Sequence, residues 1–304
     1  MSNYKVKHYR RKKSKLVPIL LTCLILIGLA IAAVFVLSKQ PKKAKVTPSS
    51  THSAQNPTKT TESNSYSSSS SAPVASGTAE VVADTGEAQW VQLKSKEKTE
   101  KFTDLSNGSI KIIKANNPQV LKTATSLQSP AIWMADVVAQ YPGTAIMNTS
   151  GFNMETGAAA GFQINNGKVF EDWSGSGSTF VVNTDGTCAA YDSSTPASEI
   201  IQKGAAMSFS FAGIIMKDGA VLPSDGSFDW KKHSLIGNDK DNNLYLIVTD
   251  TNYGYEGLLQ AISTFDMQNL VLMDGGGSSQ LTLNGETLFP SEDNRAVPDY
   301  VVLK

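Results

Sequence analysis

The residues best suited to chemistry follow an apolar run near the C-terminal end of the chain. Leu270–Met273 is apolar, Asp274 comes next, and five small residues follow: Gly275, Gly276, Gly277, Ser278 and Ser279. Glycines let the backbone approach a ligand closely and present its N–H groups, which suits an anion such as phosphate. The alternative is a tight glycine-rich turn between two strands, capped by the serines.

A second carboxylate, Asp250, follows another apolar run. Leu244–Val248 is typical of a buried strand, and Tyr255–Met267 has the apolar spacing of a helix. Together with the strand before Asp274, these segments predict a βαβ unit, whose parallel strands end at the same sheet edge. The two carboxylates then lie ~5 Å apart on neighbouring strands, or ~10 Å apart with one strand between them. The alternative for Asp250 is a cap at the end of its strand.

Other kinds of site are disfavoured or left open by the sequence. There is no G-x-x-x-x-G-K-[ST] phosphate loop, and the glycine-rich segment lacks the closing glycine of a nucleophile elbow. Ser278, His233 and Asp250 could be drawn as a catalytic triad, but no spacing in the sequence brings them together. Two aspartates and an asparagine (Asp274, Asp250 and Asn148) could ligate a hard cation, so a role for a divalent metal stays open.

Charge is balanced over the whole chain but not along it. Lys+Arg and Asp+Glu both number 27, which argues against a nucleic-acid-binding protein because such proteins carry a basic surplus. Residues 1–15 form a basic tail, and the uncharged residues 16–37 are long enough to cross a bilayer as one helix. The basic tail is therefore expected in the cytoplasm and the rest of the chain outside the cell. A cleaved signal peptide is the alternative.

The chain beyond the predicted anchor has two compositions. Residues 38–86 are rich in Ser, Thr and Pro and cannot bury enough apolar surface to fold, so we expect a disordered extracellular linker. Residues 87–304 have the length of one domain with a full core. Its expected fold is α+β, with a strand-rich mixed sheet, hairpins, one βαβ unit and few helices.

Local signals give further elements of this domain. Hairpin turns are predicted at Asn165–Gly167, Asn183–Gly186 and Lys217–Gly219, where Asn, Asp and Gly separate apolar runs. A helix is predicted to begin at Ser129 and Pro130, a capping residue followed by a first-turn proline, and to end by Tyr141.

Six segments, in order, resemble the phosphodiester glycosidase family, which includes bacterial proteins associated with exopolysaccharide. The resemblance covers Thr144 to the C-terminus, and its most specific part matches the signature D-G-G-[GS]-S-S. The segments are Asn148–Phe152, Ala160–Gly167, Phe211–Gly219, His233–Gly237, Asp274–Ser279 and Asp293–Pro298. The resemblance implies an enzyme that cleaves a sugar-1-phosphodiester.

The resemblance also implies roles for individual residues. Cleavage at an anomeric carbon needs one carboxyl group near that carbon and another to handle a proton, so Asp274 is the first catalytic candidate and Asp250 the second. The expected substrate-binding residues are Asn148, Gly151, His233, Gly275, Gly276, Gly277, Ser278, Ser279 and Arg295.

Two positions depart from the family pattern. His233 stands where the family usually has arginine, which grips phosphate at any pH, whereas histidine does so only when protonated. Asp250 is followed by Thr251, where the family commonly has Asp-Gly. Both departures bring the usual substrate into question.

The expected function is therefore that of a membrane-anchored extracellular phosphodiester glycosidase. Its substrate is expected to be a sugar-1-phosphodiester on a cell-surface glycopolymer or exopolysaccharide, cleaved by hydrolysis or transfer. One alternative is a non-catalytic protein that binds sugar phosphates or polysaccharide during exopolysaccharide or cell-wall assembly. The other is a structural surface protein in which the linker matters most.

Overall fold

The computed structural model describes residues 79–96, 100–174, 177–228 and 232–304. The predicted tail (residues 1–15), the predicted membrane helix (residues 16–37) and most of the predicted linker (residues 38–86) lie outside these residues. Within the described part of the chain, no helix is long and apolar enough to cross a membrane.

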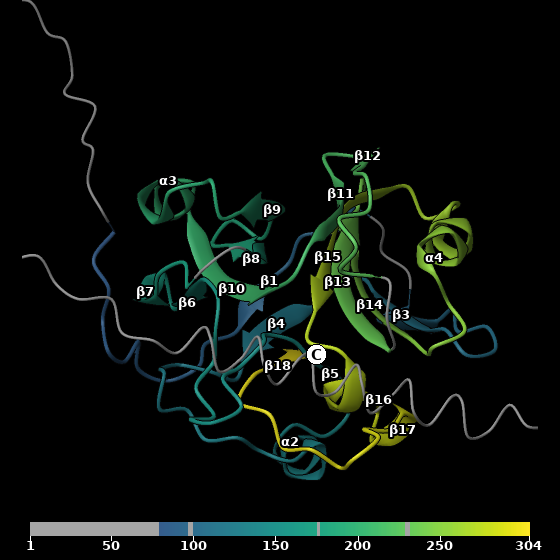
Figure 1. Ribbon diagram of the computed structural model, residues 1–304, viewed down its shortest axis with the longest axis horizontal. Coiled ribbons are helices and arrows are strands. Elements are labelled where there is room, and N and C mark those ends of the chain that lie inside the picture. The colour runs from purple at the N-terminus through teal and green to yellow at the C-terminus, as the bar shows by residue number, and fades with distance from the viewer. Residues whose placement is uncertain (1–78, 97–99, 175–176, 229–231) are drawn as a thin grey trace, which may run out of the picture. The chain divides into compact units, whose positions relative to one another are not determined.

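A six-stranded sheet carries the C-terminal strand of the chain near its middle (Figure 1). In spatial order its strands are β1 (Val91–Gln92), β4 (Gln119–Lys122), β18 (Tyr300–Leu303), β5 (Ala145–Asn148), β16 (Leu281–Leu283) and β17 (Glu286–Phe289). All its neighbouring strands pair antiparallel. Asn148, a predicted site residue, is the last residue of β5 and so lies where this inner strand ends.

A seven-stranded sheet contains the predicted βαβ unit. In spatial order its strands are β12 (Ala220–Val221), β11 (Ile214–Lys217), β15 (Met267–Met273), β13 (His233–Asp239), β14 (Leu244–Thr249), β3 (Lys111–Ala115) and β2 (Phe102–Asp104). β13 pairs antiparallel with both β14 and β15, so β14 and β15 run parallel to each other with one strand between them. Of the two spacings expected from the sequence, the structure has the wider.

Helix α4 (Tyr255–Ile262) joins β14 to β15 and is shorter than its apolar spacing predicts. The predicted helix extends to Met267, but Met267 is the first residue of β15 and pairs with Asp239. Asp266 just before it has a φ of 49°, which no helix accepts, so the end of the prediction is wrong. Pairing within the sheet determines the conformation of these last residues.

Two smaller sheets complete the strands. One has the order β10 (Ala205–Phe211), β8 (Ser178–Asn183), β9 (Cys188–Asp192), and the other pairs β6 (Gln163–Asn165) with β7 (Lys168–Glu171). The three predicted hairpins are confirmed, as β6–β7, β8–β9 and β11–β12. At the turns, Asn166 and Gly167 have φ values of 52° and 70°, and Asp218 and Gly219 have values of 51° and 79°. Positive values at both central residues identify type I′ turns.

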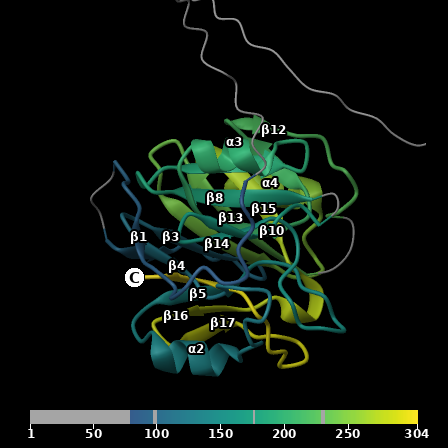
Figure 2. The ribbon, with the colours of Figure 1, turned by 90° about the vertical axis from the view of Figure 1, so that its left-hand side faces the viewer.

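The main core lies where the three larger sheets face one another. It contains side chains from the six-stranded sheet (Met147, Val301), the three-stranded sheet (Phe180) and the seven-stranded sheet (Ile236, Met273), all buried. Figures 1 and 2 show helices on the outer sides of these sheets. Strand-rich sheets with few helices confirm the α+β class.

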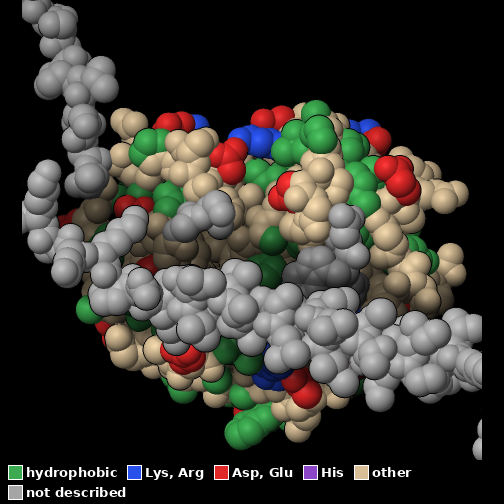
Figure 3. Space-filling model, viewed as in Figure 1, with side chains coloured by type: hydrophobic (Ala, Val, Ile, Leu, Met, Phe, Trp, Pro, Cys, Tyr) green, Lys and Arg blue, Asp and Glu red, His purple; other side chains and the backbone are tan. Residues whose placement is uncertain are grey.

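On the face shown in Figure 3, acidic and basic side chains are interspersed along the upper edge.

Smaller apolar clusters lie on the outer faces of the sheets, and helices pack against some of them. α4 covers the outer face of the seven-stranded sheet through Leu258 and Ile262. Helix α3 (Ala197–Gln202) packs Ile200 against the smaller sheets. Helix α2 (Met134–Gln140) packs Val137 against the outer face of the six-stranded sheet.

The predicted start of α2 is wrong, although its end is confirmed. The Ser129 hydroxyl accepts the backbone N–H groups of Thr125 (2.9 Å) and Ser126 (3.1 Å) instead of capping a helix. Ile132 forms a bridge with Val297, which keeps the chain extended until the helix begins at Met134. Long-range pairing thus overrides the local Ser-Pro signal.

The packed part of the chain begins before residue 87, where composition places the linker boundary. The N–H of Val82 donates to the carbonyl of Val169 (2.8 Å). Thr85 donates to the carbonyl of Thr125 through both its N–H (3.0 Å) and its hydroxyl (2.9 Å). A polar composition therefore does not prevent residues 82–85 from hydrogen bonding along the domain surface.

A buried ion pair lies next to the residues that follow the end of β5. Lys122 and Asp299 are both fully buried and paired. Asp299 also accepts the hydroxyls of Thr149 (3.1 Å) and Ser150, and the backbone N–H of Ala124 (3.3 Å). Burial lowers the pKa of Lys122 from its usual value, against the opposing attraction of Asp299. These bonds fix Thr149 and Ser150, which follow β5.

Loss of one member of this pair should be strongly destabilising. Lys122→Met leaves the Asp299 charge buried without its partner, and we expect the free energy of unfolding to fall by about 3–5 kcal/mol. Urea denaturation at pH 7.5 measures this change. The control is Lys203→Ala, which removes the exposed Lys203–Glu199 pair and should cost less than about 1 kcal/mol. Equal effects of the two substitutions would contradict the assignment.

Candidate active site

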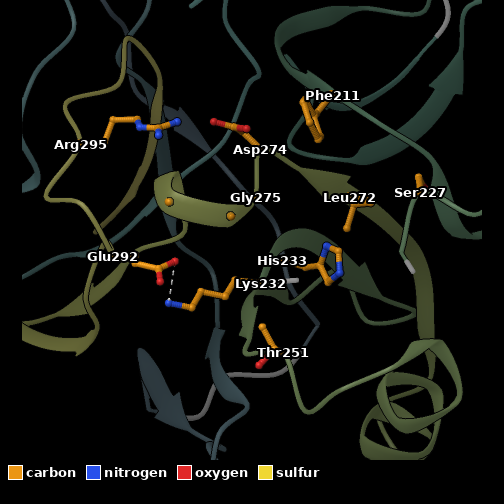
Figure 4. Close-up of a pocket in the computed structure, with 12 residues that line it drawn as sticks. Phe211, Ser227, Lys232, His233, Thr251, Leu272, Asp274, Gly275, Glu292 and Arg295 are labelled. Atoms are coloured by element: carbon orange, nitrogen blue, oxygen red, sulfur yellow. Dashed lines mark ion pairs between the residues drawn. The ribbon is translucent and has the colours of Figure 1, made fainter. Parts of the chain in front are cut away.

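A pocket of about 490 Å³ opens where the glycine-rich segment leaves β15 (Figure 4). Its walls come from the ends of β10, β13, β14 and β15 and from the segment before β18. The lining residues are Phe211, Ser227, Lys232, His233, Thr251, Leu272, Asp274, Gly275, Gly276, Gly277, Glu292 and Arg295. The pocket therefore collects several of the predicted site residues, from segments far apart in the sequence.

Each glycine of the segment is required by its surroundings. A Cβ on Gly275 would lie 2.6 Å from the carbonyl oxygen of Lys232, and one on Gly277 would lie 2.8 Å from a carboxylate oxygen of Asp293. Gly276 has a φ of 60°, and its N–H donates to the same Lys232 carbonyl (2.9 Å). The loop is thus pressed against the start of β13, and side chains would force it away.

Asp274 is held by its backbone and leaves its carboxyl group to the pocket. Its N–H donates to the Thr149 carbonyl (2.8 Å), and its own carbonyl accepts the side-chain N–H of Asn148 (2.7 Å). Among the described residues, the carboxylate oxygen Oδ2 is buried without a hydrogen-bond partner. Burial raises the pKa of Asp274 to about 6, against the lowering effects of the Ser278 hydroxyl, the Gly275 N–H and the Arg295 charge. A carboxyl group with a free oxygen and a pKa near neutrality is suited to catalysis.

Asn148 supports the site from behind and does not line the pocket. Its side-chain N–H binds the Asp274 carbonyl, while its Oδ1 accepts the Ser234 hydroxyl (2.8 Å) and the Gln280 N–H (3.0 Å). One buried amide thus joins the end of β5 to β13 and to both ends of the glycine segment. The structure places this predicted substrate-binding residue as a positioning residue.

Gly151 shapes the pocket through Phe211. A Cβ on Gly151 would lie 2.5 Å from the Phe211 ring, and the Gly151 N–H donates to the Ser210 carbonyl (2.9 Å). Phe211 lines the pocket and is 37% exposed. The glycine therefore lets an aromatic wall stand beside Asp274.

Two cations lie on the glycine-loop side of the pocket. Arg295 pairs with Asp293 through Nε (3.1 Å) and Nη2 (2.6 Å), and its guanidinium and the Asp274 carboxylate point toward each other (Figure 4). Lys232 pairs with Glu292 (3.3 Å), as the dashed line in Figure 4 shows. Sequence reasoning missed Lys232 and Glu292. The sequence offered one indication of them, because each residue immediately precedes a segment already matched to the family.

His233 lines the pocket but carries no positive charge at neutral pH. The residue is 4% exposed, and its ring stacks on Phe228, with centroids 4.0 Å apart and an angle of 24° between the planes. Burial lowers the pKa of His233 from 6.5, against the raising effect of a hydrogen bond to the Phe228 backbone. The imidazole therefore does not replace a family arginine as a phosphate-binding cation.

Asp250 does not line the pocket. Its carboxylate accepts the backbone N–H (2.9 Å) and the side-chain N–H (2.8 Å) of Asn252, in a turn that ends β14. Thr251 lines the pocket in its place. Because β13 separates β14 from β15, Asp250 and Asp274 follow strands that are not neighbours.

Ser278 and Ser279 are buried beneath the loop. Neither lines the pocket; Ser278 lies close enough to Asp274 for its hydroxyl to lower the pKa of that carboxyl group, and within the described residues the Ser279 hydroxyl has no hydrogen-bond partner. Ser278 ends a short 3₁₀ turn that starts at Gly276.

No three His, Cys, Asp or Glu side chains of the described residues converge to hold a metal ion. Of the three candidate ligands for a hard cation, Asn148 and Asp250 accept internal hydrogen bonds through their side-chain oxygens. Asp274 is the one with a free buried oxygen.

Comparisons with known proteins identify the class to which this fold and pocket belong. A family model described as phosphodiester glycosidase matches residues 142–304, more than half of the chain. The chain belongs to the phosphodiester glycosidase family.

Two relatives illustrate the range of this similarity. An uncharacterized protein YomE, derived from the SPbeta prophage of Bacillus subtilis (strain 168), is 30% identical over 179 residues, covering 52% of this chain and 27% of that protein. The chain thus spans about a quarter of that relative. The solved catalytic domain of zebrafish N-acetylglucosamine-1-phosphodiester alpha-N-acetylglucosaminidase, auto-inhibited by its pro-peptide, matches with a TM-score of 0.55 and 16% identity. That match covers 72% of this chain and 88% of the zebrafish chain and shows a shared fold.

The raised pKa of Asp274 predicts a stability cost at neutral pH. The pKa is about 6 in the folded state and about 3.8 in the unfolded state, so the folded state binds the proton more tightly. The contribution of this group to the free energy of unfolding therefore falls as pH rises from 4 to 6. Asp274→Asn avoids the charge and should raise the free energy of unfolding by up to about 3 kcal/mol at pH 8.

Urea denaturation of both proteins at pH 4.5 and pH 8 measures this effect. The advantage of the asparagine variant should be larger at pH 8. An advantage that is the same at both pH values would show that the folded carboxyl group titrates normally.

Proposed function

We propose that this chain cleaves a sugar-1-phosphodiester at the bond between the anomeric carbon and the phosphate oxygen. The observation that carries the proposal is the Asp274 carboxyl group, with one oxygen free, in a pocket whose loop side also holds Arg295 and Lys232. A phosphodiester joined to a sugar presents one negative charge next to an electrophilic carbon. The pocket offers cations for the negative charge and a carboxylate for the electrophilic carbon.

The reaction requires little acid catalysis. The C1–O bond breaks and the phosphate oxygen leaves with the electron pair, producing a phosphomonoester that Arg295 and Lys232 stabilise. The Asp274 carboxylate faces the positive charge that develops at C1, or accepts the proton of the attacking oxygen. Water as the attacking group gives hydrolysis, and a sugar hydroxyl gives transfer.

The proposed cellular location rests on the sequence before residue 79. We propose that residues 16–37 anchor the chain in the cell membrane, with the domain outside the cell on its linker. The substrate is then a cell-surface glycopolymer or exopolysaccharide.

Turnover of sugar-1-phosphodiesters tests the central proposal. The purified full chain should release free sugar from at least one member of a panel that includes a nucleotide sugar and a GlcNAc-1-phosphate diester, with and without divalent cations. Asp274→Asn should lower the rate by at least about 100-fold. An Asp274→Asn protein with full activity would remove Asp274 from the chemistry.

The pH profile of that activity provides a further prediction. Because the pKa of Asp274 is about 6, kcat/KM should rise as pH increases through 6 and then level off, since the carboxylate is the active form. Initial rates between pH 4.5 and pH 8.5 measure the profile. A rate that falls through pH 6 would instead assign the chemistry to the protonated carboxyl group.

A second candidate function is binding of a sugar phosphate or polysaccharide without cleavage, during exopolysaccharide or cell-wall assembly. The uncharged His233 at a family arginine position favours it, because the pocket then has one cation fewer than the family pattern. The same substrate panel decides between the two. Binding without sugar release by the wild-type chain, together with release by His233→Arg, would support the binding function; release by the wild type excludes a purely binding role.

A further inference from the structure

The pocket has two chemically different sides (Figure 4). Asp274, Arg295, Lys232 and Glu292 lie around the glycine loop, with the Lys232 side chain extending toward Glu292. The imidazole of His233 lies on the other side, beside Leu272 and Ser227. No charged side chain among the described lining residues accompanies it there.

The His233 ring is fixed in one orientation. It stacks on Phe228, which belongs to the apolar cluster that contains Leu235 and Leu272. The Phe228 backbone carbonyl accepts a hydrogen bond from the ring, while Nε2 is buried without any partner among the described residues. Of the two ring nitrogens, Nδ1 is therefore the one that donates to the carbonyl, and Nε2 keeps its lone pair.

That lone pair defines what the ring can bind. Burial lowers the pKa of His233, so the ring is neutral at pH 7, and the carboxylates lining the pocket, Asp274 and Glu292, lie on the other side. A neutral imidazole with an occupied N–H offers one acceptor and no donor. A phosphate oxygen is also an acceptor, so it would leave Nε2 unsatisfied at a cost. A hydroxyl or amide N–H would satisfy it.

We infer that the His233 side of the pocket is a subsite for an uncharged sugar ring, in which Nε2 accepts a hydrogen bond from a hydroxyl or acetamido N–H. The phosphate of the same ligand lies on the charged side, near Arg295 and Lys232. The apolar walls at Leu272 and Phe211 suit the C–H faces of the ring. This assignment rests on the proposed function and makes His233 a specificity-determining residue for the sugar.

Paired ligands test the subsite. Methyl phosphate fills only the charged side, whereas the sugar-1-phosphates of glucose, galactose, mannose, GlcNAc and GalNAc fill both. Dissociation constants are measured by calorimetry or ligand-observed NMR on the purified full chain, in a detergent without a sugar headgroup. We expect at least one sugar-1-phosphate to bind the wild type about tenfold more tightly than methyl phosphate. If none does, the subsite is refuted.

Variants assign the preference to His233. His233→Phe keeps an aromatic ring against Phe228 but removes the acceptor, and it should abolish the preference while leaving methyl phosphate affinity unchanged. His233→Gln supplies an acceptor oxygen and should restore part of the preference. Lys232→Met is the matched control on the charged side and should weaken both ligands by a similar factor.

Two results would overturn the assignment. An equal loss of both ligands in His233→Phe would place the phosphate at His233, and an unchanged preference in both His233 variants would remove His233 from recognition. Urea midpoints confirm that each variant is folded, and His233→Gln serves if His233→Phe is not. The test is separate from the proposed function, because sugar-1-phosphates report binding without diester cleavage. A His233-dependent preference in a chain that cleaves no diester leaves the subsite standing and refutes the enzyme.

Discussion

The site depends on one buried amide that joins two sheets. Asn148 donates to the Asp274 carbonyl and accepts from Ser234 and Gln280, so it fixes β13 and both ends of the glycine segment relative to β5. The geometry of Asp274 therefore belongs to no single element. A buried amide with all these bonds made is rigid, and loss of any one would leave a buried polar group unpaired. Rigid support of this kind is what a catalytic carboxyl group requires.

Support for Asn148 comes in turn from the buried charges below it. Lys122 and Asp299 hold Thr149 and Ser150 through the Asp299 carboxylate. Thr149 then accepts the Asp274 N–H through its carbonyl, which links the ion pair to the catalytic candidate in two steps. An isolated buried ion pair is weak evidence for stability, because desolvation offsets its attraction. Here the pair has a positional role that apolar residues of the same size could not fill.

The sequence predicts the parts of this arrangement that depend on local backbone geometry. Turn residues predict the three hairpins. Apolar runs predict β14, α4 and β15, with the two strands parallel to each other. The glycine segment, with Asp274, Arg295 and His233, does line one pocket. The sequence does not show that β13 lies between β14 and β15, since strand order is a long-range property. It therefore could not decide which distance separates Asp250 from Asp274.

Motif membership alone did not separate residues that face the pocket from residues that support it. Asn148 and Gly151 lie in one family-like segment, yet one bonds the backbone behind Asp274 and the other makes room for Phe211. Lys232 and Glu292 line the pocket without any distinctive spacing. Burial and hydrogen-bond partners decide these roles, and both follow from the three-dimensional packing.

The change from arginine to histidine at position 233 alters more than charge. An arginine there would add five donors and a permanent positive charge to a side that now has an apolar wall and one acceptor. Lys232, one residue earlier, directs its ammonium group to the opposite side of the pocket, where Arg295 also lies. Both cations of the lining therefore lie on the glycine-loop side, each paired with a carboxylate, and the His233 side has no charged side chain among the described lining residues. A pocket divided in this way suits a ligand divided in the same way, with an anionic group at one end and an uncharged ring at the other.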